Sequence, residues 1–76
     1  MKNGISKLLK RVGKNLRKLR EAKGVSQEKF AELCDLHRNY IGEIERGEAN
    51  LTFITYERIC KELNVDPATP LLPDIK

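Results

Sequence analysis

The sequence predicts one small all-α domain of five helices. A chain of 76 residues has room for a single compact core, because a domain of this size buries only about 60% of the surface that its unfolded chain exposes. Apolar residues recur at steps of three and four along most of the chain, and no stretch alternates apolar and polar residues as a half-buried strand does. We therefore treat residues 1–76 as one domain.

The first helix is predicted over residues 5–22, and residues 1–9 are expected to form the N-terminal extension of this helix. Its apolar stripe consists of Ile5, Leu8, Leu9, Val12, Leu16 and Leu19. Gly24 follows where a helix commonly ends with a left-handed residue. Gly13 inside the helix costs about 1 kcal/mol relative to Ala, which indicates that another helix approaches closely there.

The second helix is predicted to begin after Ser26, a favourable N-cap, and to end before Asp35. Its inward face consists of Phe30, Ala31, Leu33 and Cys34. Asp35 is expected to take the left-handed conformation usually given to glycine. The third helix is predicted from His37 to Arg46, with Ile41 and Ile44 inward and Gly47 as its stop.

A fourth helix is predicted to begin after Thr52 as its N-cap. Its core positions are Phe53, Tyr56, Ile59, Cys60 and Leu63. Asp66 and Pro67 offer an N-cap and a first-turn proline for a short fifth helix within residues 67–76, which Pro70 and Pro73 keep brief.

Charge is distributed unevenly along the chain. Residues 1–25 carry nine Lys and Arg against the single acid Glu21, whereas residues 26–76 carry six against ten acids, so the net charge is +4. A basic segment of this kind suits a polyanion, most simply nucleic acid. The alternative is a basic helix face that is simply solvated.

Several classes of protein are excluded. The longest apolar runs are two residues, so the sequence predicts neither a membrane span nor a secretory signal peptide. Two cysteines and one histidine fall short of a disulfide framework and of a tetrahedral zinc site. We expect no cofactor, no metal and a cytoplasmic location.

The second and third helices, joined by a turn of about three residues, form a predicted helix-turn-helix. In such a motif the second helix directs its N-terminal outward residues into the major groove of DNA. The outward residues are Arg38, Asn39, Tyr40, Gly42 and Glu43. Arg pairs with guanine, Asn with adenine and Glu with cytosine, although polar residues are common on any helix surface.

Three runs carry a family resemblance: Leu16-Arg17-Lys18-Leu19-Arg20, Gly24-Val25-Ser26-Gln27-Glu28 and Tyr40-Ile41-Gly42-Glu43-Ile44-Glu45-Arg46-Gly47. Over residues 10–66 the chain resembles the lambda-repressor/Cro-like (XRE) helix-turn-helix family. Residues 37–41, 44–47 and 50–52 look most like the controller proteins of restriction–modification systems, which are small dimeric regulators that activate and repress their own promoter.

The resemblance implies a role for each matching residue. The base-reading positions are Arg38, Asn39, Tyr40 and Glu43. The phosphate-binding positions are Arg17, Ser26, Gln27, Arg46 and Asn50. Arg20 and Glu45 match a buried ion pair, and Glu28 and Glu32 match acids that touch RNA polymerase in some activators or are otherwise a solvated face. Asp35, His37 and Asn39 depart from the family pattern, and only Asn39 changes the expected operator sequence.

The predicted function is a DNA-binding transcriptional regulator that acts as a homodimer on a near-palindromic operator, because a single module makes few base contacts. The predicted dimer interface is Ile54, Val65, Leu71 and Leu72. A phage or plasmid repressor or antitoxin of the same fold is the first alternative, and a protein-bridging adaptor is the second. An enzyme is not expected, since Cys34 and Cys60 lie on apolar faces and His37 lies at a helix boundary.

Overall fold

The computed structural model describes residues 6–73 and 75. Four α-helices follow one another along the chain: α1 (Lys7–Ala22), α2 (Gln27–Cys34), α3 (Arg38–Glu45) and α4 (Phe53–Leu63). A single 3-10 turn, η1 (Thr69–Leu71), follows α4. No strand occurs in this part of the chain. The all-α class is therefore confirmed, and the predicted fifth helix is wrong.

The fifth helix is reduced to a turn because two prolines restrict it. Asp66 does act as a cap, since its Oδ1 accepts a hydrogen bond from the Ala68 backbone N–H at 2.8 Å. Leu72, however, precedes Pro73 and is extended with ψ of 149°, as a residue before proline usually is. Helical geometry cannot continue through it.

The remaining helix boundaries follow from their caps. Ser6, Ser26 and Thr52 each accept a hydrogen bond from the backbone N–H three residues later. Ser26 and Thr52 were predicted as caps and are confirmed. Ile5 and the rest of residues 1–5, which belong to the predicted start of the first helix, lie outside the described residues.

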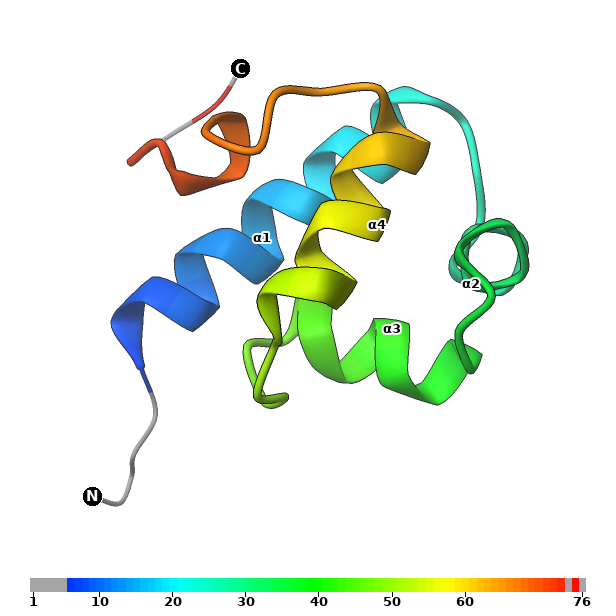
Figure 1. Cartoon of the computed structure of the whole chain (residues 1–76), viewed down its shortest axis with the longest axis horizontal. Coiled ribbons are helices and arrows are strands. Elements are labelled where there is room, and N and C mark those ends of the chain that lie inside the picture. Colours follow the sequence, from blue (N-terminus) through cyan, green and yellow to red (C-terminus); the bar gives the residue numbers. More distant parts are fainter. Residues whose placement is uncertain (1–5, 74, 76) are drawn as a thin grey trace.

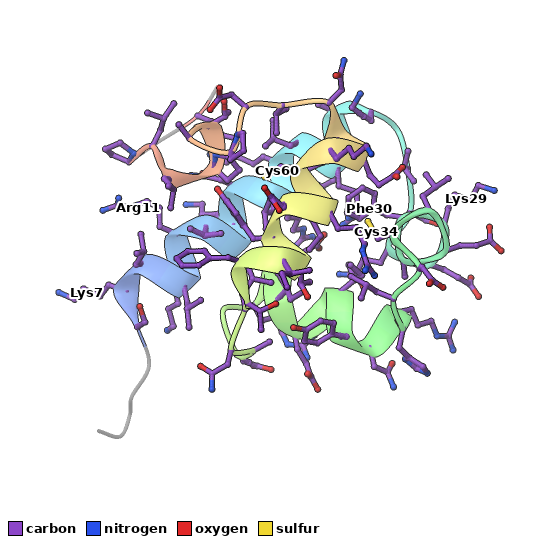
Figure 2. The ribbon with its side chains drawn as sticks, in the orientation of Figure 1. Lys7, Arg11, Lys29, Phe30, Cys34 and Cys60 are labelled. Atoms are coloured by element: carbon purple, nitrogen blue, oxygen red, sulfur yellow. The ribbon has the colours of Figure 1, made fainter. Side chains whose placement is uncertain are left out.

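The core lies where α1, α3 and α4 meet α2 (Figure 1). Its buried residues are Val12, Leu16, Phe30, Ala31, Cys34, Ile41, Ile44, Ala49, Ile59 and Leu63. Phe30 and Cys34 point from α2 toward the interior, whereas Lys29 points away from it (Figure 2). Cys60 is equally buried, so both cysteines occupy the interior positions predicted for them.

Three predicted apolar positions are wrong. Leu33 is largely exposed because it lies about 100° around α2 from Cys34 and about 160° from Ala31. Phe53 is 90% exposed because it is the first residue of α4, beyond the edge of the core that Tyr56 and Ile59 reach. Leu8 is half-exposed near the free end of α1.

Gly13 marks the closest approach between α1 and α3. A Cβ built on this glycine would lie 2.2 Å from the Ile44 carbonyl oxygen and 2.8 Å from that of Glu45. The close helix approach predicted at Gly13 is therefore confirmed. The left-handed residues predicted to end helices are also confirmed, with φ of 72° at Gly24, 58° at Asp35 and 75° at Gly47.

Candidate nucleic-acid interface

The turn between α2 and α3 sets the direction in which α3 leaves the body of the protein. Asp35 ends α2 in the left-handed conformation, and the Leu36 N–H donates to the Ala31 carbonyl at 2.9 Å. His37 then caps α3, with its Nδ1 accepting from the Asn39 N–H at 3.0 Å. The first turn of α3 is consequently held at the surface, at the lower edge of the molecule in Figure 1.

The residues predicted to read bases share this surface. Arg38, Asn39 and Glu43 are exposed on α3. Tyr40 is half-buried against the core, and its hydroxyl donates to the Asn50 carbonyl at 3.4 Å. Tyr40 therefore connects α3 to the loop before α4, and the three exposed side chains present donors and acceptors suited to base edges.

Arg38 is engaged in a surface ion pair. Its Nη1 lies 3.3 Å from Oε2 of Glu28 in α2, and both side chains are more than half exposed. Exposed pairs of this kind contribute about 0–1 kcal/mol, so Arg38 is free to exchange Glu28 for another acceptor at little cost. Glu32, the other acid considered for polymerase contact, pairs with Lys29 at 3.1 Å on α2.

Arg20 and Glu45, expected to pair, lie in contact in the interior. Arg20 Nε donates to Glu45 Oε2 at 2.7 Å and its Nη2 donates to Oε1 at 3.1 Å. Arg20 Nη1 also donates to the Val25 carbonyl at 2.7 Å. Because every side-chain oxygen of Glu45 is occupied, this network ties α1 and the start of α2 to the end of α3.

Gln27 belongs to the same network rather than to open solvent. Its Nε2 donates to Glu45 Oε1 at 2.9 Å, and the side chain is half-buried. Ser26, beside it, is exposed, but its hydroxyl oxygen caps α2 by accepting from the Lys29 N–H at 3.0 Å. Both residues therefore lie at the start of α2, and the Ser26 hydroxyl and the Gln27 amide already have hydrogen-bond partners within the protein.

Gly42 is not on the outward face to which the sequence assigns it. It is buried, and a Cβ there would lie 3.1 Å from Nη1 of Arg46. The Arg46 guanidinium thus folds back over α3 while its Nε donates to Glu48 at 3.0 Å. Arg46 and Asn50 are both exposed in the stretch between α3 and α4.

The basic residues of α1 divide between two sides of that helix. Arg17 is exposed and pairs with Glu21 at 3.0 Å, and Lys10 lies against Gly47 in the loop after α3. Arg11 and Lys18 instead donate to backbone carbonyls near the C-terminus, at Leu71 and Ile75. The basicity of residues 1–25 is consequently not all available to DNA.

Asn15 is a structural residue that the sequence reasoning missed. It is buried, and its Nδ2 donates to the carbonyls of Pro70 at 2.9 Å and Leu72 at 2.8 Å. The available signal was an asparagine, a poor helix former, in the middle of a strongly periodic helix.

Five large apolar side chains are exposed on α1, at the start of α4 and at the C-terminal turn, and four of them line two neighbouring hollows: Leu8, Phe53, Ile54 and Leu71. This apolar face consists of Leu8, Phe53, Ile54, Leu71 and Leu72. It contains three of the four predicted interface residues. Val65, the fourth, is half-buried and packs against the core instead.

The two thiols are unsuited to nucleophilic chemistry. Burial, with a further contribution from Glu62, raises the pKa of Cys34 from 9.0 to about 11, against an opposing effect of Arg58. Burial also raises the pKa of Cys60. Both groups therefore stay protonated near neutral pH. Within residues 6–73 and 75, no three His, Cys, Asp or Glu side chains gather as metal ligands would, and no helix there has the length and apolarity needed to span a membrane.

Comparison with known proteins identifies relatives with this arrangement. A helix-turn-helix family profile matches residues 16–69. The chain is 48% identical over 56 residues to control protein C.BamHI of Bacillus amyloliquefaciens, covering 72% of this chain and 69% of that protein. It is 43% identical over 53 residues to control protein C.SmaI of Serratia marcescens, covering 70% of this chain and 63% of the relative.

Solved structures agree. The restriction-modification controller protein C.AhdI of Aeromonas hydrophila superposes with a TM-score of 0.79 at 39% identity, covering 82% of this chain and 94% of that one. C.Esp1396I, solved as a tetramer in complex with its natural 35 base-pair operator, superposes with a TM-score of 0.75 at 43% identity and 80% coverage of each chain. The chain therefore belongs to the helix-turn-helix family of DNA-binding transcription regulators and is a relative of the restriction–modification controller proteins.

Proposed function

We propose that this protein is a sequence-specific regulator of transcription of the controller type, which binds the promoter of its own gene and times the expression of a linked restriction enzyme. The observation that carries the proposal is the exposed face of α3. Arg38, Asn39 and Glu43 stand there on a helix held by the Arg20–Glu45 network, while the family and its control proteins supply the biological setting.

The side chains divide into two proposed roles. Arg38, Asn39 and Glu43 read base edges, and Tyr40 supports them from beside the groove. Arg17, Arg46, Asn50 and the start of α2 at Ser26 and Gln27 contact phosphates, which fix the register without reading sequence. For Gln27 the support is its position, since its side-chain amide is committed to Glu45.

We further infer that the protein acts as a cytoplasmic homodimer on a near-palindromic operator. The support is the apolar face, together with the relative C.Esp1396I, which was solved as a tetramer on operator DNA. Pairing of two domains places two copies of α3 about one helical turn of DNA apart and doubles the number of base contacts.

Contact of Glu28 or Glu32 with RNA polymerase stays a secondary proposal. Glu32 is the stronger candidate, because Glu28 pairs with Arg38 beside the proposed base-reading surface, whereas Glu32 pairs with Lys29 on its own helix. Reversal of the charge at Glu32 is expected to reduce activation of transcription while operator affinity stays unchanged.

The experiment that tests the function is a mobility-shift titration with duplex DNA from upstream of the protein's own coding sequence, against a random duplex. Arg38→Ala is expected to lower the affinity for upstream DNA about 5- to 150-fold and to leave random DNA nearly unchanged. Arg17→Ala is expected to weaken both duplexes by a similar factor, because phosphate contacts are insensitive to sequence. Equal affinity of the unaltered protein for both duplexes contradicts sequence-specific regulation and favours the bridging alternative.

A further inference from the structure

The position of the C-terminal segment, residues 69–73, depends on side chains of α1. Asn15 is only 2% exposed in that helix, and its amide group donates one hydrogen bond to the Pro70 carbonyl and the other to the Leu72 carbonyl. Arg11, one turn earlier, donates from Nη1 to the Leu71 carbonyl at 3.1 Å. Three successive carbonyls of the segment thus accept from two neighbouring side chains of α1.

The segment has little structure of its own to hold it there. Within it, the Leu71 and Leu72 N–H groups donate to the carbonyls of Ala68 and Thr69, which closes only the single 3-10 turn. Figure 2 shows Arg11 on the side of α1 that faces this turn. Because a single 3-10 turn is marginal on its own, the contacts with α1 determine its place.

The segment presents to solvent two of the five side chains of the apolar face. Leu71 is 43% and Leu72 is 49% exposed, and Leu71 lines a hollow together with Phe53 and Ile54. Leu71 also forms one wall of an apolar hollow of about 160 Å³, which Leu8 and Phe53 line from α1 and α4. Release of the segment would therefore remove two apolar side chains and open one wall of the hollow.

The occupant that fits this face is a second copy of the chain. None of its five side chains is charged, so two copies can bury these side chains against each other across a two-fold axis without burying a charge among them. None of its side chains belongs to α3, and the C-terminal turn lies on the opposite side of α1 from that helix (Figure 1). Dimerisation through it leaves the exposed residues of α3 free.

We propose that Asn15 is a positioning residue for dimerisation, holding the C-terminal segment in the conformation that a second copy binds. The inference rests on the homodimer proposed above. Each protomer must have its segment docked, so the dissociation constant of the dimer varies with the inverse square of the docked fraction. A change that lowers this fraction from nearly one to about a third raises the dissociation constant roughly tenfold.

Sedimentation equilibrium of the full chain without DNA tests the inference. Asn15→Asp keeps the shape of the side chain and replaces the amide donors with oxygens that face two carbonyls. Arg11→Ala removes the third hydrogen bond from an exposed position, and Lys14→Ala is the control on the adjacent exposed residue. All three changes lower the net charge by one unit, so differences among them do not arise from charge alone.

The dissociation constant of the dimer is expected to rise about tenfold or more in Asn15→Asp and about threefold in Arg11→Ala, and to stay within about twofold in Lys14→Ala. Urea unfolding at a concentration where every variant is monomeric measures stability separately. A merely structural Asn15 lowers the unfolding free energy without changing dimerisation of the folded chain.

The outcomes separate the two proposals. If the unaltered protein stays monomeric at high micromolar concentration, the homodimer is wrong and the role of Asn15 falls with it. If it dimerises and both Asn15→Asp and Arg11→Ala match it within about twofold, only the role of Asn15 is wrong. Should Asn15→Asp fail to fold, the comparison of Arg11→Ala with Lys14→Ala decides the question in the same way.

Discussion

Replacement of Gly13 by alanine is expected to destabilise the protein, although alanine is the better helix former. In an exposed helix the change gains about 1 kcal/mol. Here the new Cβ would lie 2.2 Å from the Ile44 carbonyl oxygen, about 1 Å short of a normal carbon–oxygen contact of roughly 3.3 Å. The obstacle is backbone on both sides, so α1 and α3 must separate.

The expected net loss is about 1–3 kcal/mol, because overpacking of a rigid contact exceeds the gain in helix propensity. For a domain of this size each kcal/mol lowers the melting temperature by about 4–8 °C. Separation of the helices would also lengthen the Arg20–Glu45 contacts, which join the same two elements, so operator affinity should fall together with stability.

Gly42→Ala is the matched control. It makes the same chemical change inside α3, but the nearest atom to its Cβ would be Nη1 of Arg46, at 3.1 Å, which is the far end of a flexible side chain, and Gln27 Oε1 at 3.7 Å would be in ordinary van der Waals contact. This variant is expected to gain up to about 1 kcal/mol. Urea denaturation followed by circular dichroism measures both variants. A Gly13→Ala protein as stable as the unaltered chain would show that α1 and α3 do not pack as described.

Three further changes test other contacts. Glu45→Gln leaves the buried Arg20 without a counter-charge and is expected to lower the unfolding free energy by about 3–5 kcal/mol. Arg20→Met in the double variant should restore part of this loss, and full additivity in a urea double-mutant cycle contradicts the pairing. Asp35→Gly relieves a left-handed residue with φ of 58° and is expected to raise the unfolding free energy by up to about 1 kcal/mol; a loss in thermal melting refutes this reasoning. Because the Cys34 pKa is raised from 9.0 to about 11, the folded state holds its proton more tightly than the unfolded state. Stability is therefore expected to fall as pH rises from about 9 toward 11, and this fall should diminish in Cys34→Ala when both are unfolded in urea at each pH.

The elements that local chemistry determines were predictable from the sequence. Ser26 and Thr52 cap helices in any context, and Asp35 between two apolar stripes requires a left-handed turn. Gly13 indicated a close contact, because glycine destabilises a helix interior unless another element packs too closely for a side chain. In each of these places the local preference and the fold agree.

The errors occurred where a pattern depends on what lies across from it. Phe53 satisfies the apolar spacing of α4, yet the first turn of that helix extends beyond the core, so its side chain is left exposed. The helical spacing of α3 predicts that Gly42 faces outward, whereas the guanidinium of Arg46 covers it. The helical spacing around Asn15 could not identify its hydrogen-bond partners, because these are backbone carbonyls 55 and 57 residues further along the chain.

Gly13 and Asn15 of α1 explain how one helix can position both the proposed DNA surface and the apolar face. At Gly13 the helix touches the backbone of α3, and two residues later Asn15 holds the C-terminal segment on another side. α1 is thus a rigid spacer between the base-reading helix and the apolar face. Since the distance between two copies of α3 depends on both contacts, loosening either one should impair binding to a two-site operator more than binding to a single half-site.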